Sequence, residues 1–419
     1  MLDTTTKPWF RKLHWQILAA MALGILTGLL GGPGIAAKTG WLGTLFIRLL
    51  KMIIVPLIFT SIVSGVASVG GGRDLGRLFS KTLGFYVVTS ALAIFAGLFA
   101  VNLIQPGVGA NIAGAAKADV PDISAPSSPV DLLLDIVPEN ALAAAAKPDM
   151  LSLIFFCILL GMAIASLPEA PRTALLNLFN AGFQAMMKLT GGVIIFLPVG
   201  VFGLMSRMVG ESGLESFRAL GLYMLTIALS LSFHLFVTLP LVLIVLGRID
   251  PRIHFRNMLE ALIMAFSTSS SAATLPVTIT SVEKKVGVSN RVTSFVLPMG
   301  ATVNMDGTAL YECAGVLFIS QVLGIDLGLG SQLVVVVTAL LASIGAAAVP
   351  SAGLVIIFIV LESVNLRGPE VDVIVGAMLA IDRPLDMFRT AVNVFSDSCG
   401  AAVIAKSEGE SNIDDAVVA

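Results

Sequence analysis

Apolar runs long enough to cross a membrane recur along the whole chain, and they constrain its fold more than any other feature. WQILAAMALGILTGLLGG (15–32) and SLIFFCILLGMAIASLP (152–168) are two of them. As helices, such runs span roughly 30 Å of hydrocarbon. Only 12% of the 419 residues are charged, against about 25% in an average soluble domain, which is too few to cover a soluble globule. The sequence predicts an all-α polytopic membrane protein, because a β-barrel would show short alternating segments.

Clusters of lysine and arginine mark the cytoplasmic side of such proteins. Cationic residues gather before residue 15, at 73–81 and at 248–256, whereas the stretch 106–150 is acidic and rich in Ala, Pro and Ser. That stretch is interpreted as an external loop. The pattern predicts a multi-pass protein of the cell membrane, with both termini in the cytoplasm and crossings near residues 14–31, 43–69, 79–104, 150–168, 190–209 and 217–247.

Two later segments break this alternation. Residues 257–283 have cationic flanks on both sides and a small polar cluster in the middle, as expected for a hairpin that enters and leaves on one side. A second such segment, 330–366, lacks cationic flanks and is assigned to the outer side. Each precedes a helix that carries Asn and Asp, which is typical of inverted repeats around a midplane site. Ser/Gly packing could imitate one hairpin. We therefore predict eight transmembrane helices and two re-entrant helical hairpins.

The last segment, IDRPLDMFRTAVNVFSDSCG, concentrates ionisable groups on one narrow helical face. Each would cost roughly 2.5–3.5 kcal/mol at the centre of a membrane helix if unpaired, so these groups must meet one another, ligands or water. A structural ion-pair network, for instance between Asp386 and Arg389, is the alternative, and it leaves Asn393 and Asp397 unexplained. The residues on this face are Asp382, Asp386, Arg389, Asn393 and Asp397.

The stretch VNMDGTALYE (303–312) places further polar groups inside an apolar segment. Asn304 and Thr308 share a helical face, but Asp306 points away from it. We predict a helix break here, helped by Gly307, which lowers the cost of unwinding. Free carbonyls beside a carboxylate are hard oxygen ligands that suit a small cation.

Other polar residues carry weaker signals. Tyr86, Thr89 and Ser90 bring three oxygen-bearing side chains to one face of the third crossing. His234 lies in an apolar run and is interpreted as a hydrogen-bonded packing residue rather than a proton carrier. The three histidines show no metal-ligand spacing, and no serine–histidine spacing supports an intramembrane protease.

Four motifs in this order resemble the dicarboxylate/amino acid:cation symporters, the glutamate/aspartate transporter family: STSSSAATLP, PMGATVNMDGTALYE, ASIGAAAVPSAG and LDMFRTAVNVFSD. The likeness extends from about residue 7 to 408. It implies a homotrimer whose subunits work independently. It also implies a fixed scaffold (1–76 and 106–216), a moving elevator domain (77–105 and 217–410) and a disordered tail (411–419).

The resemblance also implies roles for individual residues. Asp386 binds the α-ammonium of the substrate and Arg389 its side-chain carboxylate. The other implied substrate contacts are Ser270, Ser271, Thr308, Val349, Gly353, Thr390 and Asn393. The resemblance implies three Na⁺ sites. The first comprises Asp397, Asn393, Asn304 and the Gly300 carbonyl, and the second comprises Thr302, Met305, Ser343, Ile344 and Ala346. The third comprises Tyr86, Thr89, Ser90, Asn304 and Asp306. No organic cofactor and no nucleic acid are expected.

The pairing of Asp386 with Arg389 favours an acidic amino acid, because each charged end of the substrate meets its complement. The resemblance predicts a secondary active symporter, not an enzyme, that imports aspartate or glutamate with Na⁺. A C4-dicarboxylate symporter is the nearest alternative, and a channel is disfavoured because occluding hairpins leave no continuous pore. Glu312 stands where proton-cotransporting relatives have glutamate, so proton coupling is a further hypothesis. Relatives carry an additional arginine at the positions of Ser269 or Met387, a role that Arg383 could fill.

Overall fold

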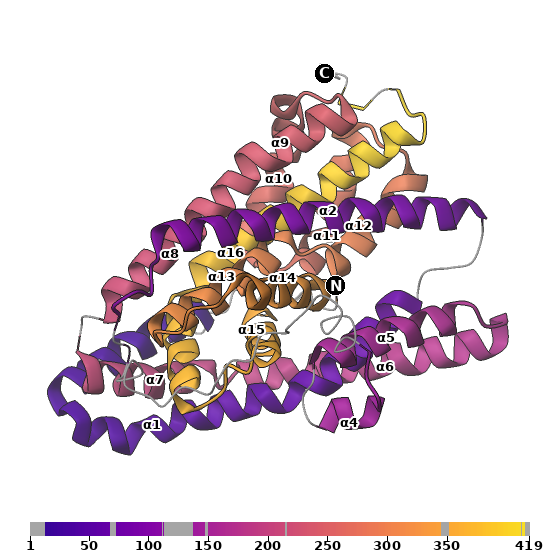
Figure 1. Cartoon of the computed structure of the whole chain (residues 1–419). Coiled ribbons are helices and arrows are strands. Elements are labelled where there is room, and N and C mark those ends of the chain that lie inside the picture. Colours follow the sequence, from indigo (N-terminus) through magenta and orange to yellow (C-terminus); the bar gives the residue numbers. More distant parts are fainter. Residues whose placement is uncertain are drawn as a thin grey trace, which may run out of the picture.

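The computed structural model describes residues 13–67, 73–110, 112, 137–146, 150–213, 216–344, 352–411 and 413–414. Every regular element in these ranges is a helix, so the all-α prediction is confirmed for this part of the chain. Two groups of helices can be followed in Figure 1. One contains the first helix and the magenta segments along the lower part of the view, and the other contains the remaining elements above it.

The first group is built on one long helix. This helix, α1, packs against three later helices of the group, while a short helix contacts the first of them. The members are α1 (Leu13–Ala67), α4 (Ala141–Ala146), α5 (Met150–Ala165), α6 (Glu169–Ile194) and α7 (Leu197–Ser212).

The first two expected crossings, 14–31 and 43–69, both correspond to α1, which consists of two helical segments that meet at a kink. Helix α1 is interrupted only at Gly32, where φ is 52° and ψ is −153°, and the backbone is helical again from Pro33. Gly32 tolerates the positive φ. Pro33 fits the first position of the following helical segment because its missing N–H would have no partner there. Residues 32–42 therefore connect the two crossings as a kinked helix.

Glycines allow α1 and α7 to approach closely. A Cβ atom on Gly28 would lie 2.8 Å from the Ser206 carbonyl oxygen, and one on Gly203 would lie 2.7 Å from the Gly43 nitrogen. Small residues at such contacts are the usual device for packing helices within a membrane.

We expect Gly203→Ala to lower the free energy of unfolding by about 1–3 kcal/mol, because the added methyl group overpacks against backbone atoms. The thermal unfolding midpoint of the purified protein in detergent measures this. Gly221→Ala is the matched control, since a Cβ there has nothing within 4 Å. Equal midpoints for the two variants would contradict the packing argument.

The fifth crossing differs from its expected bounds. Residues 190–209 lie across the junction of α6 and α7, which meet at a bend of 49°. The sequence interpretation placed no helix at 169–189, where most of α6 lies. The mixture of polar residues such as Asn177, Asn180 and Gln184 concealed its apolar face.

The second group contains the elements that form the candidate site. Helix α2 crosses this group and packs against α13 and α8 (Figure 1). The members are α2 (Arg73–Ile104), α8 (Ser216–Phe233), η3 (His234–Thr238), α9 (Leu239–Val242), η4 (Leu243–Gly247), α10 (Pro251–Thr268), α11 (Ser271–Ser281), η5 (Val282–Val286), α12 (Asn290–Val303), α13 (Asp306–Val322), α14 (Leu329–Ile344), α15 (Ala352–Ser363) and α16 (Pro369–Ser407).

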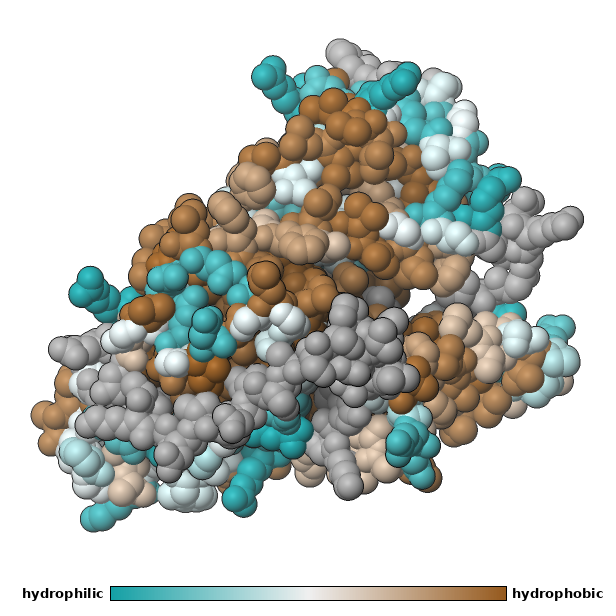
Figure 2. Space-filling view, viewed as in Figure 1, coloured by the Kyte–Doolittle hydropathy of each residue, from teal (hydrophilic) through white to brown (hydrophobic). Residues whose placement is uncertain are grey.

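Within the described residues, three helical segments are long and apolar enough to cross a membrane, namely Trp15–Ala67, Arg77–Ile104 and Phe217–Gly247. The bent pair formed by α6 and α7 makes a fourth if it acts as one span. Large apolar side chains lie on the outside of these segments, and Figure 2 shows the resulting apolar surface in brown. This exposure is consistent with a polytopic membrane protein, whose lipid-facing side chains are apolar.

A tight turn joins α10 to α11 at the position predicted for the first hairpin tip. Ser269 adopts a left-handed conformation (φ 53°) that ends α10, and the Ser270 side chain accepts a hydrogen bond from the backbone N–H of Ala273 at the start of α11. Such a cap satisfies an otherwise unpaired helix N–H. The two helices pack against each other. In the second predicted hairpin, residues 345–351 between α14 and α15 lie outside the described residues.

Candidate functional site

The predicted helix break lies between α12 and α13. Asn304 (φ −98°, ψ 98°) and Met305 (φ −126°, ψ 59°) both leave the helical conformation, and α13 then begins at Asp306. The break therefore turns the side chains of Asn304 and Asp306 away from the directions that one straight helix would give them. This part of the sequence interpretation is confirmed.

The role expected for Gly307 was wrong. Gly307 lies in the first turn of α13 rather than in the unwound segment. A Cβ at this position would lie 3.1 Å from both the Cα and the carbonyl oxygen of Arg389 in α16. The Gly307 N–H donates to Asn393 Oδ1 at 2.8 Å. Gly307 is needed because α13 and α16 approach closely there.

Asp306 is the centre of a buried hydrogen-bond cluster. Its Oδ1 accepts from Ser90 at 2.6 Å and from Thr89 at 3.3 Å, both in α2. Its Oδ2 accepts from Ser396 of α16 at 2.6 Å and lies 3.1 Å from His234 Nε2. Of the predicted set of Tyr86, Thr89, Ser90, Asn304 and Asp306, these hydrogen bonds bring together Thr89, Ser90 and Asp306.

His234 is buried and begins the π-helical turn η3. Pro240 follows six residues later; it has no N–H to continue α-helical pairing, and the Leu239 N–H bonds back to the His234 carbonyl instead. The prediction that His234 is a hydrogen-bonded buried residue is confirmed. Its partner, Asp306, was not anticipated.

Asp397 and Asn304 form a second polar cluster beside the first. Asn304 Nδ2 donates to Asp397 Oδ1 at 2.9 Å and to Ser396 Oγ at 3.0 Å. A Cβ on Gly300 would lie 2.5 Å from both Asp397 Oδ1 and the Tyr86 hydroxyl oxygen, so only glycine leaves room there. The Tyr86 hydroxyl donates to the Val296 carbonyl at 2.9 Å.

These two clusters offer oxygen atoms to a cation. Asp306 and Asp397 are both buried, and the side-chain oxygen of Asn304 is buried without a hydrogen-bond partner among the described residues. A buried carboxylate and an unpaired buried carbonyl are costly unless a positive charge meets them. Carboxylate, amide and hydroxyl oxygens together match the ligands that hard cations prefer.

Arg389 is the largest fully buried charged side chain in α16. Its Nη2 lies 3.0 Å from Asp382 Oδ1 and 3.0 Å from Asp386 Oδ1. The guanidinium carbon lies 3.9 Å from the centroid of the Tyr311 ring, a cation–π geometry. Nε and Nη1 have no hydrogen-bond partner in the ranges that the structure describes. The group therefore keeps donors for an anionic ligand.

Several other predicted substrate contacts lie near this arginine. A Cβ on Gly353 would lie 3.3 Å from Arg389 Nη1. Asn393 Nδ2 lies 3.4 Å from Thr308 Oγ1, which links α16 to α13. The Thr390 hydroxyl donates to the Asp386 carbonyl of its own helix at 2.8 Å. Arg383, considered as a stand-in for the missing arginine, has its Nη1 3.4 Å from Asp386 Oδ2.

Other predicted residues are not drawn into either cluster by the described contacts. Thr302 is exposed, and its hydroxyl bonds to carbonyls of its own helix. Ser343 is buried and also bonds within its helix. Ser270 caps α11, and the neighbouring Ser271 is buried. Met305 is buried at the break, Ile344 ends α14, and Ala346 and Val349 lie outside the described residues.

Glu312 is fully buried, and neither of its carboxyl oxygens has a hydrogen-bond partner among the described residues. It follows Tyr311, whose ring packs on Arg389. An unpaired acidic group within a membrane protein is a candidate functional group.

Sequence reasoning gave no site role to three residues that the structure brings into these clusters. His234 and Ser396 both bond to Asp306, and Asp382 contacts Arg389. Sequence analysis had already placed Asp382 on the polar face of α16, but it assigned no ligand to this residue. Ser396 gave no signal, since a serine in a small-residue helix is ordinary packing.

Known proteins resemble this chain over nearly its whole length. The model of the sodium:dicarboxylate symporter family matches residues 13–407. The proton/sodium-glutamate symport protein of Bacillus caldotenax is 35% identical over 408 residues, which cover 96% of this chain and 95% of that protein. The human excitatory amino acid transporter 3 is 34% identical, and the match covers 95% of this chain and 86% of that protein. The proton/glutamate-aspartate symporter of Escherichia coli K12 is 35% identical, and the match covers 95% of this chain and 93% of that protein. The chain belongs to the sodium:dicarboxylate symporter family.

Proposed function

We propose that this chain is a secondary active symporter that imports aspartate and glutamate together with Na⁺. The observation that carries the proposal is the buried arrangement on α16, where Arg389 and Asp386 offer opposite charges next to the oxygen-rich break between α12 and α13. An acidic amino acid carries both complementary charges. The relatives named for glutamate and aspartate symport support this substrate class.

The substrate would lie between Arg389 and Asp386. Arg389 would bind the side-chain carboxylate through donors that have no described protein partner, because a guanidinium recognises carboxylates directionally. Asp386 would bind the α-ammonium group. Ser270, Ser271, Thr308, Val349, Gly353, Thr390 and Asn393 would complete the site.

Sodium ions would occupy the two oxygen-rich clusters. Asp306, with Thr89 and Ser90, supplies one set, and Asp397, with Asn304, supplies another. The remaining proposed ligands are Tyr86, the Gly300 carbonyl, Asn393 and a third set of Thr302, Met305, Ser343, Ile344 and Ala346.

Coupling to cations follows from electrostatics. An acidic amino acid brings one net negative charge into a negative interior, which costs about 2.3 kcal/mol per 100 mV. Two or three co-transported cations reverse the sign of that cost and contribute their own gradient.

Transport would proceed by an elevator movement in a homotrimer whose termini face the cytoplasm. Helices α1 and α5–α7 would form the scaffold, and α2 with α8–α16 the transport domain. The two-residue turn between α10 and α11 would form the tip of the first of two re-entrant hairpins. The mutual packing of α1 with α5, α6 and α7 supports this division.

Competition separates this function from C4-dicarboxylate symport. In proteoliposomes with an inward Na⁺ gradient, unlabelled aspartate and glutamate should compete with labelled aspartate at concentrations far below those needed for succinate. Succinate competing as well as aspartate would favour the alternative, because succinate has no ammonium group for Asp386 to bind. Currents without saturable uptake would indicate a channel.

Glu312 would carry a co-transported proton. At a fixed Na⁺ gradient, an inward proton gradient should accelerate aspartate uptake by the unmodified protein and leave Glu312→Gln unaffected, because glutamine cannot take up the proton. Glu260→Gln is the control, since Glu260 is an exposed carboxylate paired with Lys285. Uptake insensitive to the proton gradient in both the unmodified protein and Glu312→Gln would remove proton coupling through Glu312.

A further inference from the structure

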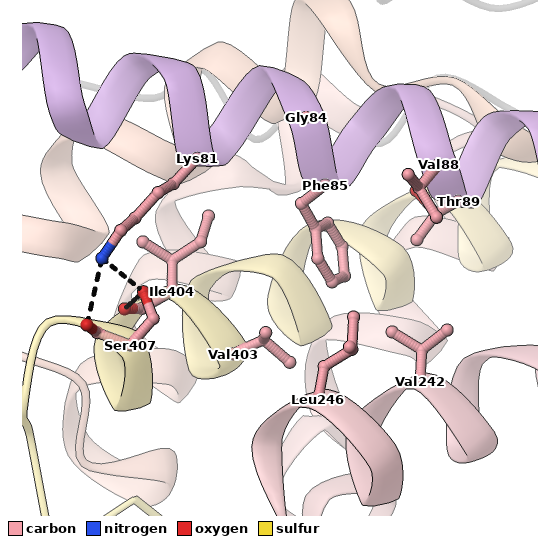
Figure 3. Close-up of a pocket in the computed structure, with 10 residues that line it drawn as sticks. All are labelled: Lys81, Gly84, Phe85, Val88, Thr89, Val242, Leu246, Val403, Ile404 and Ser407. Atoms are coloured by element: carbon pink, nitrogen blue, oxygen red, sulfur yellow. Dashed lines mark hydrogen bonds between the residues drawn. The ribbon is translucent and has the colours of Figure 1, made fainter.

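A surface groove of about 400 Å³ lies between α2, the α9–η4 segment and α16 (Figure 3). Its walls are almost entirely apolar. Val88 and Leu246 are 50% and 57% exposed, so the groove opens onto the exposed apolar surface of these helices. The apolar wall consists of Phe85, Val88, Val242, Leu246, Val403 and Ile404.

The groove has one polar end. Lys81 and Ser407 lie there, and the Lys81 ammonium group donates to the carbonyl and hydroxyl oxygens of Ser407, both at 3.0 Å (Figure 3). From Lys81 the groove follows α2 to Thr89, which is roughly 12 Å by helical rise. A charged end and a long apolar floor match the shape of an amphiphile.

Three cationic side chains surround one carboxylate at the polar end of the groove. Glu408 lies 2.6 Å from Lys81, 2.8 Å from Arg77 and 3.7 Å from Arg291. Hydrogen bonds from Arg77 and Lys81 lower the pKa of Glu408 to about 2, so this carboxylate is ionised at neutral pH. Among the described ion pairs, three cations therefore meet one ionised carboxylate at the end of α16.

We infer that this groove binds an anionic phospholipid, with one acyl chain along the apolar floor and the phosphate at the cationic cluster of Arg77, Lys81 and Arg291. Acyl chains gain free energy from apolar burial, and anionic headgroups are attracted to basic residues at the membrane surface. An acidic amino acid does not fit the groove, because its charges would meet hydrocarbon side chains. The inference does not depend on the proposed transport function.

Native mass spectrometry of the purified full-length chain tests the site, with phosphatidylglycerol and phosphatidylcholine of identical acyl chains as probes. We expect saturable binding of phosphatidylglycerol, tighter than that of phosphatidylcholine. Gly84 lines the groove, and a Cβ there has nothing within 4 Å, so Gly84→Leu should fill the groove and remove this binding. Gly221→Leu makes the same change at an exposed, open position of α8 and should keep it.

A second variant, which changes the charge at the polar end, should strengthen lipid binding rather than remove it. Glu408→Gln removes the carboxylate that these three cations now pair with, so phosphatidylglycerol should bind about fivefold more tightly, even though ion pairs are lost. If the cluster served only to hold α2 against α16, Glu408→Gln would bind phosphatidylglycerol as tightly as the unmodified protein does, or less tightly.

Thermal unfolding provides an independent readout. Phosphatidylglycerol should raise the unfolding midpoint of the unmodified protein and of Gly221→Leu, because a ligand that binds only the folded state stabilises it. Gly84→Leu should show no such rise. Equal binding of the two lipids, or phosphatidylglycerol binding by Gly84→Leu at the unmodified level, would overturn the inference.

Discussion

Arg389→Cys should lose uptake of aspartate and glutamate while still transporting a small neutral amino acid. Truncating one partner of a buried charged hydrogen-bonded pair costs about 2–5 kcal/mol, so affinity for acidic substrates should fall by at least about 30-fold. A neutral substrate has no side-chain carboxylate and loses no contact. Kinetics of labelled aspartate and labelled serine uptake in proteoliposomes measure both effects.

Arg389→Lys is the informative companion variant. A lysine keeps the charge but not the planar set of donors, nor their stacking on Tyr311, so acidic uptake should stay low. Arg207→Gln is the matched control, because Arg207 is a partly exposed arginine of α7 that pairs with Glu211 of its own helix. If Arg389 were only a structural counterion for Asp382 and Asp386, Arg389→Cys would lose neutral uptake as well. Unchanged acidic uptake would remove the assigned role.

Asp306→Asn should remove most of the Na⁺ dependence of substrate binding. Asp306 now accepts hydrogen bonds from Thr89, Ser90 and Ser396 and lies beside His234 Nε2. An asparagine replaces one acceptor oxygen by an NH₂ donor that faces these donors, and it loses the charge that a cation would meet. We expect the Na⁺ concentration for half-maximal binding to rise by at least about tenfold, as for a loss of about 1.4 kcal/mol.

The measurement for Asp306→Asn is aspartate binding by calorimetry across a series of NaCl concentrations, with choline chloride keeping the ionic strength constant. Asp372→Asn is the control, because it removes a carboxylate from the same protein at a partly exposed ion pair with Lys51. Such pairs contribute about 0–1 kcal/mol. An unaltered Na⁺ dependence in Asp306→Asn would exclude this carboxylate as a cation ligand.

The ion pairs of Arg389 also bear on mechanism. Asp382 and Asp386 both approach the same nitrogen, Nη2, while Nε and Nη1 have no partner among the described residues. A substrate carboxylate can therefore meet open donors before it displaces either aspartate. The ammonium group of the substrate, bound next to Asp386, would then take over part of the pairing with Asp386 that Arg389 now provides. Each charged end of the substrate would then meet a group of opposite charge, while the net negative charge of the substrate would be left for the co-transported cations to offset.

The features that could be predicted from sequence were those set by local periodicity. The polar face of α16 and the break before Asp306 follow from helical geometry, because a 3.6-residue repeat fixes which side chains share a face. Long apolar runs likewise gave the helical class.

The contacts between distant segments could not be predicted in this way. His234 and Asp306 are 72 residues apart, and nothing in either segment specifies how the two helices face each other. The close approach of α13 and α16 at Gly307 depends on tertiary packing, so a glycine that looked like a helix breaker proved to be a contact point. The sequence analysis assigned no element to residues 32–42 between the first two crossings, and the structure makes them helical from Pro33 onward.

Accumulation of labelled aspartate in proteoliposomes tests most directly whether cations and cargo together neutralise the buried carboxylates. With an inward Na⁺ gradient, the internal aspartate concentration should rise well above the external one, and it should collapse when a Na⁺ ionophore dissipates the gradient. Uptake that reaches only the external concentration, with the same course whether or not a Na⁺ gradient is present, would contradict the account.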